Sequence, residues 1–390
     1  MIPYGKHHID EDDIQAVVDI LRSNFLTQGP AVEAFEKAVA EYAGVKYAVA
    51  VSSGTAALHL AALAAGVGPG KSVVTSPITF VASANAAKYC GADVVFADID
   101  PETINMSPDA LRKALLKNSN VKAIIPVHFA GLPCDMVAIK NLADEAGAVL
   151  IEDAAHALGA TYPNGKRVGC CENSLMTIFS FHPVKAIAAG EGGMITTNDE
   201  ATYRKLIRSR SHGINKLDDT LQIEAEAFTA GEQNPWYYEM QELGFHYRIT
   251  DIQCALALSQ FSMLDSFISR RRDLVKNYDL AFAGMKNCSP AQMIGRDQSG
   301  HHVYVLQIDF KQVALTRGQV MKKLRECGIG SQVHYIPVPS HPYYRQLGFK
   351  PEDYPNAQKY YQEALSIPLF YDLTEKQQRK VVSTIKDLLV

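Results

Sequence analysis

The sequence predicts an α/β fold with a mostly parallel central sheet flanked by helices, followed by a smaller C-terminal α+β domain. Two observations lead to this prediction. Short apolar segments recur through the first half of the chain, and segments with helical spacing of apolar residues separate them; this alternation is typical of a parallel sheet covered on both faces. The chain of 390 residues is also longer than one ordinary hydrophobic core, so two domains are expected.

The elements of the first domain follow from these patterns in order. Residues 10–21 begin with acidic side chains and continue with apolar residues at helical spacing, and residues 32–42 form a second amphipathic segment, so both are predicted helices. The predicted strands are residues 48–51, 72–75, 94–97, 123–127, 148–152, 175–181 and 194–197. The polar, acidic stretch 213–233 is expected to be a loop or lid.

The C-terminal part shows a different order of elements. A long helix is expected over residues 249–271, where it would connect the domains. Strands are expected at 303–308 and 329–335, and helices at 317–327 and 375–389. We therefore expect a large domain of residues 1–260 and a small domain of residues 261–390.

Composition excludes several classes of protein. Apolar residues make up 47% of the chain and charged residues 21%, as in soluble globular enzymes. The net charge of −4 and the absence of basic runs argue against nucleic acid. The first residues lack the apolar core of a signal peptide, and the apolar run 56–67 is too short to span a bilayer, so no membrane association is expected.

Cysteine usage bears on the compartment and on metals. The seven cysteines are scattered, which agrees with a reducing compartment and a cytoplasmic protein. Cys170 and Cys171 are adjacent and lack the spacing of a zinc or redox motif. No metal site is expected.

Lys185 is the first candidate catalytic residue. It lies after the apolar segment 175–181, and a Gly-rich stretch then leads into the segment 194–197. A lysine amine held between two buried strands can lose its charge by desolvation, and a neutral amine can attack a carbonyl and hold it as a Schiff base. The alternative is a surface lysine on a loop.

Asp153 follows the predicted strand 148–152. In open α/β sheets ligands bind outside the carboxyl ends of the strands, so an aspartate there suits a buried cation such as a protonated pyridine nitrogen. The alternative is an aspartate that caps the following turn.

Ser53, Gly54 and Thr55 lie between the predicted strand 48–51 and an Ala/Leu-rich helical segment. The N–H groups and dipole at such a helix start favour an anion, although the Gly-Lys-Ser/Thr of a Walker loop is absent. An anion site, a buried aspartate and a loop lysine, in that order, match the needs of pyridoxal 5′-phosphate: a phosphate anchor, a partner for the pyridine nitrogen and a lysine.

Over essentially its whole length the chain resembles fold-type I, pyridoxal phosphate-dependent nucleotide-sugar aminotransferases of the DegT type. The matching motifs lie at residues 26–30, 53–55, 77–82, 152–156, 179–182 with Lys185, 191–193 and 248–253. Segments 236–241, 255–260 and 332–335 are similar to the branch that makes UDP-4-amino-4,6-dideoxy-N-acetyl-β-L-altrosamine, a precursor of pseudaminic acid.

The resemblance implies roles for the cofactor site. Lys185 would hold the cofactor and move a proton between substrate and cofactor, and Asp153 would pair with the pyridine nitrogen. Phe80 matches the position that stacks on the ring, with plain core as its alternative; His156 matches a position beside the ring, with a satisfied core histidine as its alternative. The implied phosphate contacts are Ser53, Gly54, Thr55 and Ser180.

The resemblance also implies a homodimer with shared active sites. In the family a partner-subunit asparagine contacts the phosphate within Gly-Phe-Asn-Tyr-Arg, where this chain has His246. The departure puts that contact in doubt, although an imidazole N–H can donate to phosphate, and Arg248 could compensate. The implied substrate-binding residues are Tyr4, Asn24, Phe25, Leu26, Thr27, Gln332, Val333, His334 and Tyr335. Without the resemblance, a core tyrosine and a surface histidine fit Tyr335 and His334 equally well.

The expected activity is transfer of an amino group from L-glutamate to C4 of a UDP-linked 4-keto-6-deoxy-N-acetylhexosamine. The alternatives are an aminotransferase for another keto-sugar nucleotide, a sugar dehydratase of the same fold, or a catalytically inactive regulatory protein. The dehydratases carry histidine at the position of Lys185, which favours transamination. A nicotinamide-binding oxidoreductase is excluded because Gly-x-Gly-x-x-Gly is absent after an early strand.

Overall fold

The computed structural model describes residues 1–215 and 221–389. A seven-stranded sheet forms its centre, with strand order β1-β7-β6-β5-β4-β2-β3. The strands are β1 (Tyr47–Val51), β2 (Ser72–Thr75), β3 (Asp93–Phe96), β4 (Val121–Ile125), β5 (Val149–Asp153), β6 (Met176–Ser180) and β7 (Gly193–Thr197). β7 runs antiparallel to both of its neighbours, and the other pairs are parallel. The predicted mostly parallel sheet is confirmed, and each predicted strand lies close to its expected bounds.

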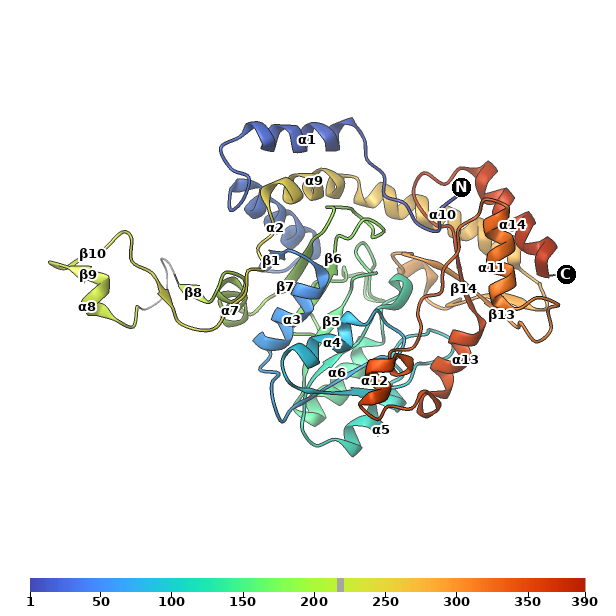
Figure 1. Cartoon of the computed structure of the whole chain (residues 1–390), viewed down its shortest axis with the longest axis horizontal. Helices are drawn as coiled ribbons and strands as arrows, with labels where there is room; N and C mark the ends of the chain where they lie inside the picture. The colour runs from blue at the N-terminus through green and yellow to red at the C-terminus, as the bar shows by residue number, and fades with distance from the viewer. Residues whose placement is uncertain (216–220, 390) are drawn as a thin grey trace.

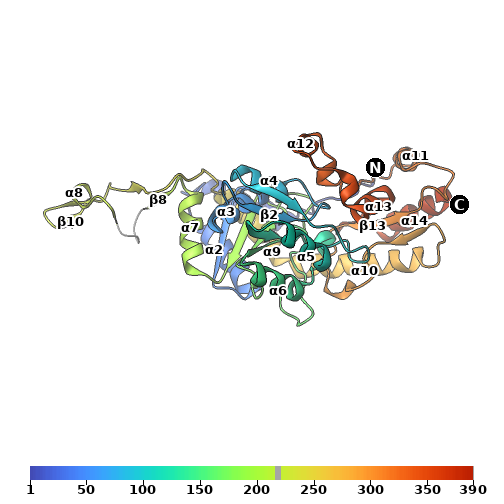
Figure 2. The same ribbon diagram turned by 90° about the horizontal axis from the view of Figure 1, so that it is seen from below.

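Helices cover both faces of this sheet (Figures 1 and 2). On one face α3 (Gly54–Ala64), α4 (Ala82–Tyr89) and α7 (Glu200–Arg210) contribute to one buried apolar cluster. On the other face α2 (Pro30–Ala43), α5 (Pro108–Lys117), α6 (Met136–Ala146) and α9 (Asp251–Ser262) contribute to a second. The strands are therefore largely buried on both sides, which explains their mainly apolar sequences.

The two faces matter for β5, because side chains alternate along a strand. Leu150 belongs to the cluster under α2, α5, α6 and α9, whereas Ile151 belongs to the cluster under α3, α4 and α7. By the same alternation, Glu152 and Asp153 at the end of β5 lie on opposite faces. Asp153 thus lies on the face that α3 and α4 cover.

The C-terminal part has a core of its own. An antiparallel sheet of β12 (Cys288–Pro290), β13 (Tyr304–Ile308) and β14 (Ala364–Ile367) packs with α10 (Leu264–Phe282), α11 (Arg317–Glu326) and α14 (Glu375–Leu389). The shorter helices α12 (Pro342–Gln346) and α13 (Pro355–Glu363) follow α11. Ile2 is buried in this core and forms a bridge with Ile329, so the chain start packs against the C-terminal part. The division at residue 260 stays a prediction.

Two expected elements differ from the structure. The single helix expected over 249–271 is two helices, because the backbone turns at Met263 (ψ 0°) and its N–H bonds to the carbonyls of Gln260 and Phe261 rather than to that of Ser259. The strand expected over 329–335 is wrong. This segment pairs only through isolated bridges, Ile2 with Ile329 and Gln332 with Ser366, because it crosses from one partner to the other.

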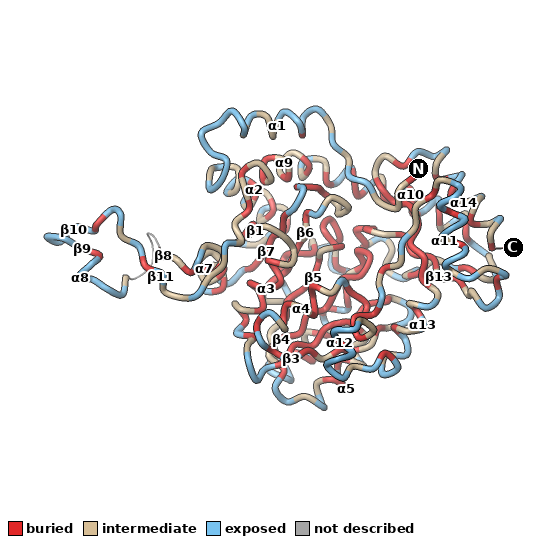
Figure 3. Tube along the Cα trace, in the orientation of Figure 1, coloured by how far each residue is buried: buried red, intermediate tan, exposed pale blue. Residues whose placement is uncertain are grey.

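A projecting arm extends from the body of the molecule (Figures 1 and 3). We define it as residues 213–215 and 221–243, which contain the pair β8 (Ile214–Asn215) and β11 (Glu239–Met240), the helix α8 (Glu224–Ala227) and the hairpin β9 (Phe228–Thr229) and β10 (Glu232–Gln233). The loop expected over 213–233 therefore holds a short helix and a hairpin, and its residues 216–220 lie outside the described residues. The first helix, α1 (Glu11–Arg22), lies against α9. Among the described residues, no helix combines the length and the apolar character needed to cross a bilayer.

Candidate active site

A cavity of about 730 Å³ lies beside the carboxyl ends of the central strands. Residues at the ends of β5 and β6 and within four residues after β1, β2 and β4 contribute to its wall, as expected for a ligand site in an open α/β sheet. The predicted site residues that line it are Tyr4, Ser53, Gly54, Thr55, Phe80, Asp153, His156, Ser180, Lys185, Gln332, Val333, His334 and Tyr335. The fold thus gathers into one cavity side chains that are more than 300 residues apart.

Lys185 lies on the loop after β6, and its side chain lines the cavity. Its backbone N–H donates to the carbonyl of His182 at 2.8 Å, which closes a turn at this point. Burial lowers the pKa of Lys185 to about 8, against the opposing charge of Asp153. Lys185 therefore lies on a loop, as both interpretations require, but its side chain faces the cavity and its lowered pKa favours the neutral amine.

Asp153 ends β5 and is 5% exposed. Its Oδ1 accepts the N–H of Ala155 at 3.1 Å, and its Oδ2 accepts the hydroxyl of Ser83 at 2.6 Å. The carboxylate therefore caps the following turn and also lines the cavity. The turn cap raised by the sequence is therefore present, and the pairing of Asp153 with a cofactor nitrogen stays a prediction.

The start of α3 forms a cradle for an anion. The Ser53 hydroxyl accepts the N–H of Ala56 at 3.1 Å, while Gly54 and Thr55 line the cavity; their N–H groups belong to the first turn, which a helix leaves without internal partners. A Cβ atom at Gly54 would lie 2.9 Å from the Cβ of Ser180. The glycine is thus needed to bring α3 close to β6, and the cradle suits a phosphate.

His156 and Tyr335 form the wall next to Lys185. His156 is buried; its Nδ1 lies 3.3 Å from the backbone nitrogen of Ala130, and its Nε2 lies 3.0 Å from the hydroxyl of Tyr335. Burial, together with the charges of Lys185 and His334, holds the pKa of His156 well below its usual value. His156 is a hydrogen-bonded buried histidine that also lines the cavity.

Burial distinguishes between the alternatives for two further predicted residues, Phe80 and His334. Phe80 lines the cavity and is 58% exposed, so it is not a core residue. His334 is 6% exposed, and its Nδ1 lies 2.8 Å from the hydroxyl of Ser366, so it is not a surface histidine. Burial lowers its pKa to about 4, and the ring of Tyr4 packs 5.5 Å away.

The remaining predicted residues lie outside this cavity. Asn24, Phe25, Leu26 and Thr27 are all exposed; Thr27 bridges to Thr250, and the carbonyl of Leu26 accepts the N–H of Asp251. His246 is exposed and stacks on His212 at 5.3 Å, and Arg248 is partly buried. Both groups therefore lie near the start of α9, outside the lining of the cavity.

Several residues of the site were missed from the sequence. Thr79, His182, Glu191, His302 and His341 line the cavity, and Ser83 bonds to Asp153 behind it. The ring of His302 packs 4.3 Å from that of His156. Ser83 had one available signal: it lies three residues after Phe80, and this spacing places two side chains on one face of a helical turn. His302 had none, because only the tertiary fold brings β13 to this wall.

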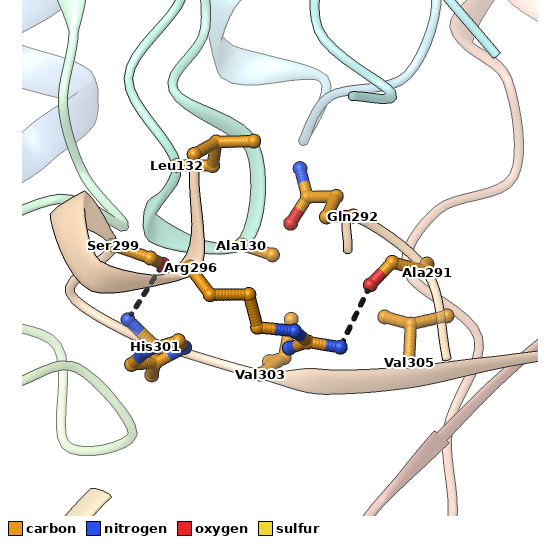
Figure 4. A pocket seen from close by; sticks show the side chains of 9 residues that line it. All are labelled: Ala130, Leu132, Ala291, Gln292, Arg296, Ser299, His301, Val303 and Val305. Carbon is orange, nitrogen blue, oxygen red and sulfur yellow. Dashed lines mark hydrogen bonds between the residues drawn. The ribbon is translucent and has the colours of Figure 1, made fainter. Parts of the chain in front are cut away.

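A second, much smaller cavity has Ala130 and Leu132 in its wall (Figure 4). Its volume is about 10 Å³, and Arg296 and His301 are among its lining residues. The Arg296 guanidinium donates to the carbonyl of Ala291 at 3.1 Å, and the N–H of His301 donates to the Ser299 hydroxyl at 3.0 Å. This volume holds about one water molecule, so the cavity is too small for a cofactor.

The residues present fit pyridoxal phosphate. The 730 Å³ cavity has the size of a ligand site that holds a cofactor together with a substrate. Its wall offers an amine of lowered pKa at Lys185, a carboxylate at Asp153 and an anion cradle at the start of α3. Among the described residues no group of three or more His, Cys, Asp and Glu side chains is placed to hold a metal ion.

Comparison with known proteins agrees with this site. The sequence profile of the DegT/DnrJ/EryC1/StrS aminotransferase family matches residues 7–386. The chain is 39% identical over 391 residues to the spore coat polysaccharide biosynthesis protein SpsC of Bacillus subtilis, covering 100% of this chain and 97% of that protein. It is 36% identical over 390 residues to the UDP-4-amino-4,6-dideoxy-N-acetyl-beta-L-altrosamine transaminase of Campylobacter jejuni, covering 100% and 98%.

A solved structure matches over the same length. The putative sugar aminotransferase Spr1654 from Streptococcus pneumoniae, in its PMP form, has a TM-score of 0.88 and 29% sequence identity, and the match covers 100% of this chain and 99% of that one. The likeness therefore includes the central sheet, the C-terminal part and the segments that form the cavity.

Proposed function

Since this chain belongs to the DegT/DnrJ/EryC1/StrS family of pyridoxal phosphate-dependent sugar aminotransferases, we propose that it is a nucleotide-sugar aminotransferase. The proposed reaction transfers an amino group from L-glutamate to C4 of a UDP-linked 4-keto-6-deoxy-N-acetylhexosamine. The observation that carries the proposal is that Lys185, Asp153 and the anion cradle of α3 line one cavity. The product would be a 4-amino sugar nucleotide of the kind used for pseudaminic acid.

The residues of the cavity have separate tasks in this proposal. Pyridoxal phosphate, when bound, supplies an electron-withdrawing ring that stabilises negative charge at the reacting carbon. Lys185 would hold the cofactor, and its amine would accept and return the proton at the reacting carbon. Asp153 would pair with the ring nitrogen, and Ser53, Gly54, Thr55 and Ser180 would bind the phosphate.

The acceptor wall consists of Tyr4, Gln332, Val333, His334 and Tyr335, all of which line the cavity. Burial keeps His334 neutral, with a pKa of about 4. Neutral donors and acceptors suit sugar hydroxyl, amide and carbonyl groups, which carry no charge. The relative from C. jejuni, whose name states a 4-amino-4,6-dideoxy sugar product, supports C4 as the position aminated.

A homodimer with shared active sites completes the proposal. Asn24–Thr27, His246 and Arg248 are absent from the lining of their own cavity, and the projecting arm carries uncovered apolar side chains, with Trp236 73% and Leu243 81% exposed. Apolar side chains gathered on an extension of this kind are typical of a protein–protein contact. A second copy of the chain would cover the arm and receive His246 and Arg248 near its phosphate site.

The substrate proposal is tested with a panel of acceptors. The enzyme would be supplied with L-glutamate and one of three keto sugars: the UDP-linked 4-keto-6-deoxy-N-acetylhexosamine, a dTDP-linked 3-keto sugar or a UDP-linked 4-keto pentose. Mass spectrometry and NMR of the product identify the aminated carbon. We expect the highest kcat/KM for the first acceptor, with the amine at C4.

The same panel tests the acceptor, the reaction type and the amino donor separately. A higher kcat/KM for either competing sugar would replace the acceptor and leave the aminotransferase activity intact. A sugar product that has lost water and carries no new amino group would instead indicate the dehydratase alternative. Replacement of glutamate by glutamine or aspartate in a parallel series tests the donor.

A further inference from the structure

Asp153 is held from behind by a side chain outside the proposed cofactor and substrate contacts. Ser83 lies in the first turn of α4, is 0% exposed, and donates its hydroxyl to Oδ2 of Asp153 at 2.6 Å. An ionised carboxylate only accepts hydrogen bonds, so the single hydroxyl proton of Ser83 is committed to Asp153. The contact is short, as charge-assisted O–H···O⁻ bonds are.

A second hydroxyl lies behind the first. Thr79 Oγ1 is 2.7 Å from Ser83 Oγ, and Thr79 is 2% exposed. Because the Ser83 proton points to the carboxylate, Thr79 must be the donor to the Ser83 oxygen. The result is a buried chain, Thr79 to Ser83 to Asp153, in which each hydrogen bond polarises the next.

The backbone around Asp153 leaves little freedom for any other arrangement. The N–H of Asp153 donates to the carbonyl of Pro126 at 2.9 Å, and its carbonyl accepts the N–H of His128 at 3.0 Å. Oδ1 is held by Ala155. With the backbone fixed on both sides, the Ser83 hydroxyl is the side-chain contact that, together with the N–H of Ala155, sets the rotation of the carboxylate about its last bond.

From this geometry we propose that Ser83, supported by Thr79, is the positioning residue that fixes the orientation of the Asp153 carboxylate toward the cofactor ring. Phe80 lies between Thr79 and Ser83 in sequence and lines the same cavity. The turn that presents Phe80 to the ring is therefore also the turn that orients Asp153. Ser83 does not line the cavity, so it acts on the cofactor only through Asp153.

The test compares pyridoxal phosphate binding by the full-length apo-protein and its variants, measured by titration of the visible absorbance band. Ser83→Ala should raise the Kd about 10- to 100-fold, the size expected for a lost hydrogen bond to a charged group. Thr75→Val is the matched control, because Thr75 is also fully buried and its hydroxyl bonds to the carbonyl of Ile125 rather than to Asp153. The control should bind the cofactor as the unmodified protein does.

A double-mutant cycle shows whether Ser83 acts through Asp153. In the Asp153→Asn background, Ser83→Ala should weaken binding by a much smaller factor than in the unmodified protein. The midpoint of the pH titration of the absorbance band should also shift in Ser83→Ala and stay unchanged in Thr75→Val. A merely structural role would change stability alone.

Three results would overturn the proposal: a Kd for Ser83→Ala equal to that of the control, the same loss in both backgrounds of the cycle, or an unshifted pH titration. If Ser83→Ala does not fold, Thr79→Val replaces it and is measured with Asp153 intact and in the Asp153→Asn background, because Thr79 also lines the cavity and only a loss that depends on Asp153 reports on the hydroxyl chain. It should weaken binding more than Thr75→Val does, and equal values would count against the proposal. Since the inference rests on the proposed cofactor chemistry, failure of the unmodified protein to bind pyridoxal phosphate at Lys185 would instead overturn the function.

Discussion

The Nε2 atom of His156 and the hydroxyl oxygen of Tyr335 lie 3.0 Å apart, although 179 residues separate them in the chain. The other ring nitrogen of His156 faces the backbone N–H of Ala130, which can only donate. A neutral His156 must therefore carry its proton on Nε2 and donate it to Tyr335. The proton of the Tyr335 hydroxyl is then free to be donated into the cavity that this residue lines.

Tyr335→Phe tests this arrangement. The change leaves the N–H of His156 without its acceptor, which costs about 1–3 kcal/mol of stability for a buried group, and it removes the hydroxyl from the cavity. We expect both the free energy of unfolding and kcat to fall. Tyr344→Phe is the control: it removes a hydroxyl bonded to Asn85 at 2.6 Å away from the cavity, so it should lower stability while kcat stays unchanged. An equal kcat for the two variants would contradict a role for Tyr335 in turnover.

Lys185→Ala should reduce turnover by at least about 10⁴-fold, because it removes both the covalent attachment and a proton carrier of the kind worth about 10²–10⁴. The protein should fold and still bind pyridoxal phosphate noncovalently through the cradle of α3. Borohydride should fix the cofactor to the unmodified protein and not to the variant. Lys166→Ala, at an exposed lysine paired with Glu172, serves as the control and should keep full activity. Near-normal turnover in Lys185→Ala would refute the assignment.

Asp153→Asn should lower the rate of the half-reaction with glutamate by about two to four orders of magnitude, the equivalent of the roughly 3–5 kcal/mol lost when a buried ion pair is broken. Asp153→Glu should restore little, because the longer side chain displaces the charge. The rate is read from single-turnover decay of the cofactor band. Asp135→Asn removes a carboxylate that only caps α6 and should leave the rate unchanged. A similar rate in both asparagine variants would reduce Asp153 to a turn cap.

The pKa of Lys185 predicts how covalent attachment of the cofactor depends on pH. Burial lowers this pKa from 10.5 to about 8, and only the neutral amine reacts. The rate constant for recombination of apo-protein with pyridoxal phosphate should therefore rise with pH up to about 8 and level off above it. Stopped-flow absorbance measures this rate, with a free lysine analogue as the reference. A protein rate that keeps rising to pH 10 alongside the analogue would show an unperturbed lysine.

Shared active sites are tested by mixing two inactive proteins. A heterodimer of the Lys185→Ala variant and the His246→Ala/Arg248→Ala double variant contains one site with an intact lysine and intact partner residues. We expect about half of the activity per dimer to return, measured as amine transfer after the heterodimer is purified. Lys185→Ala mixed with Asp153→Asn cannot assemble an intact site and should stay inactive. The absence of recovery in the first mixture, with verified heterodimers, would mean that each site is built from one chain.

The sequence was sufficient to predict the central sheet and the edge of that sheet at which the candidate site lies. The central strands are largely buried on both faces, so their sequences are mainly apolar, and polar residues lie at or shortly after the ends of several of them. Asp153 and Ser53 could be placed at one edge because the carboxyl ends of parallel strands meet there. The same local signals failed for residues 329–335, where Ile329 and Val333 suggested a strand but the segment forms only isolated bridges.

The tertiary structure alone decided what surrounds that edge. Local patterns report burial and backbone preference, whereas a contact such as His156 with Tyr335, or Ser83 with Asp153, depends on where separate elements cross. The sequence alone was therefore enough to predict the fold class and to single out Lys185, Asp153 and the anion cradle of α3 as site candidates. The packing of α4 and of residues 332–335 against the sheet decided which groups hold the site residues in place. Ser83 contacts Asp153, and Tyr335 contacts His156, because separate elements meet there.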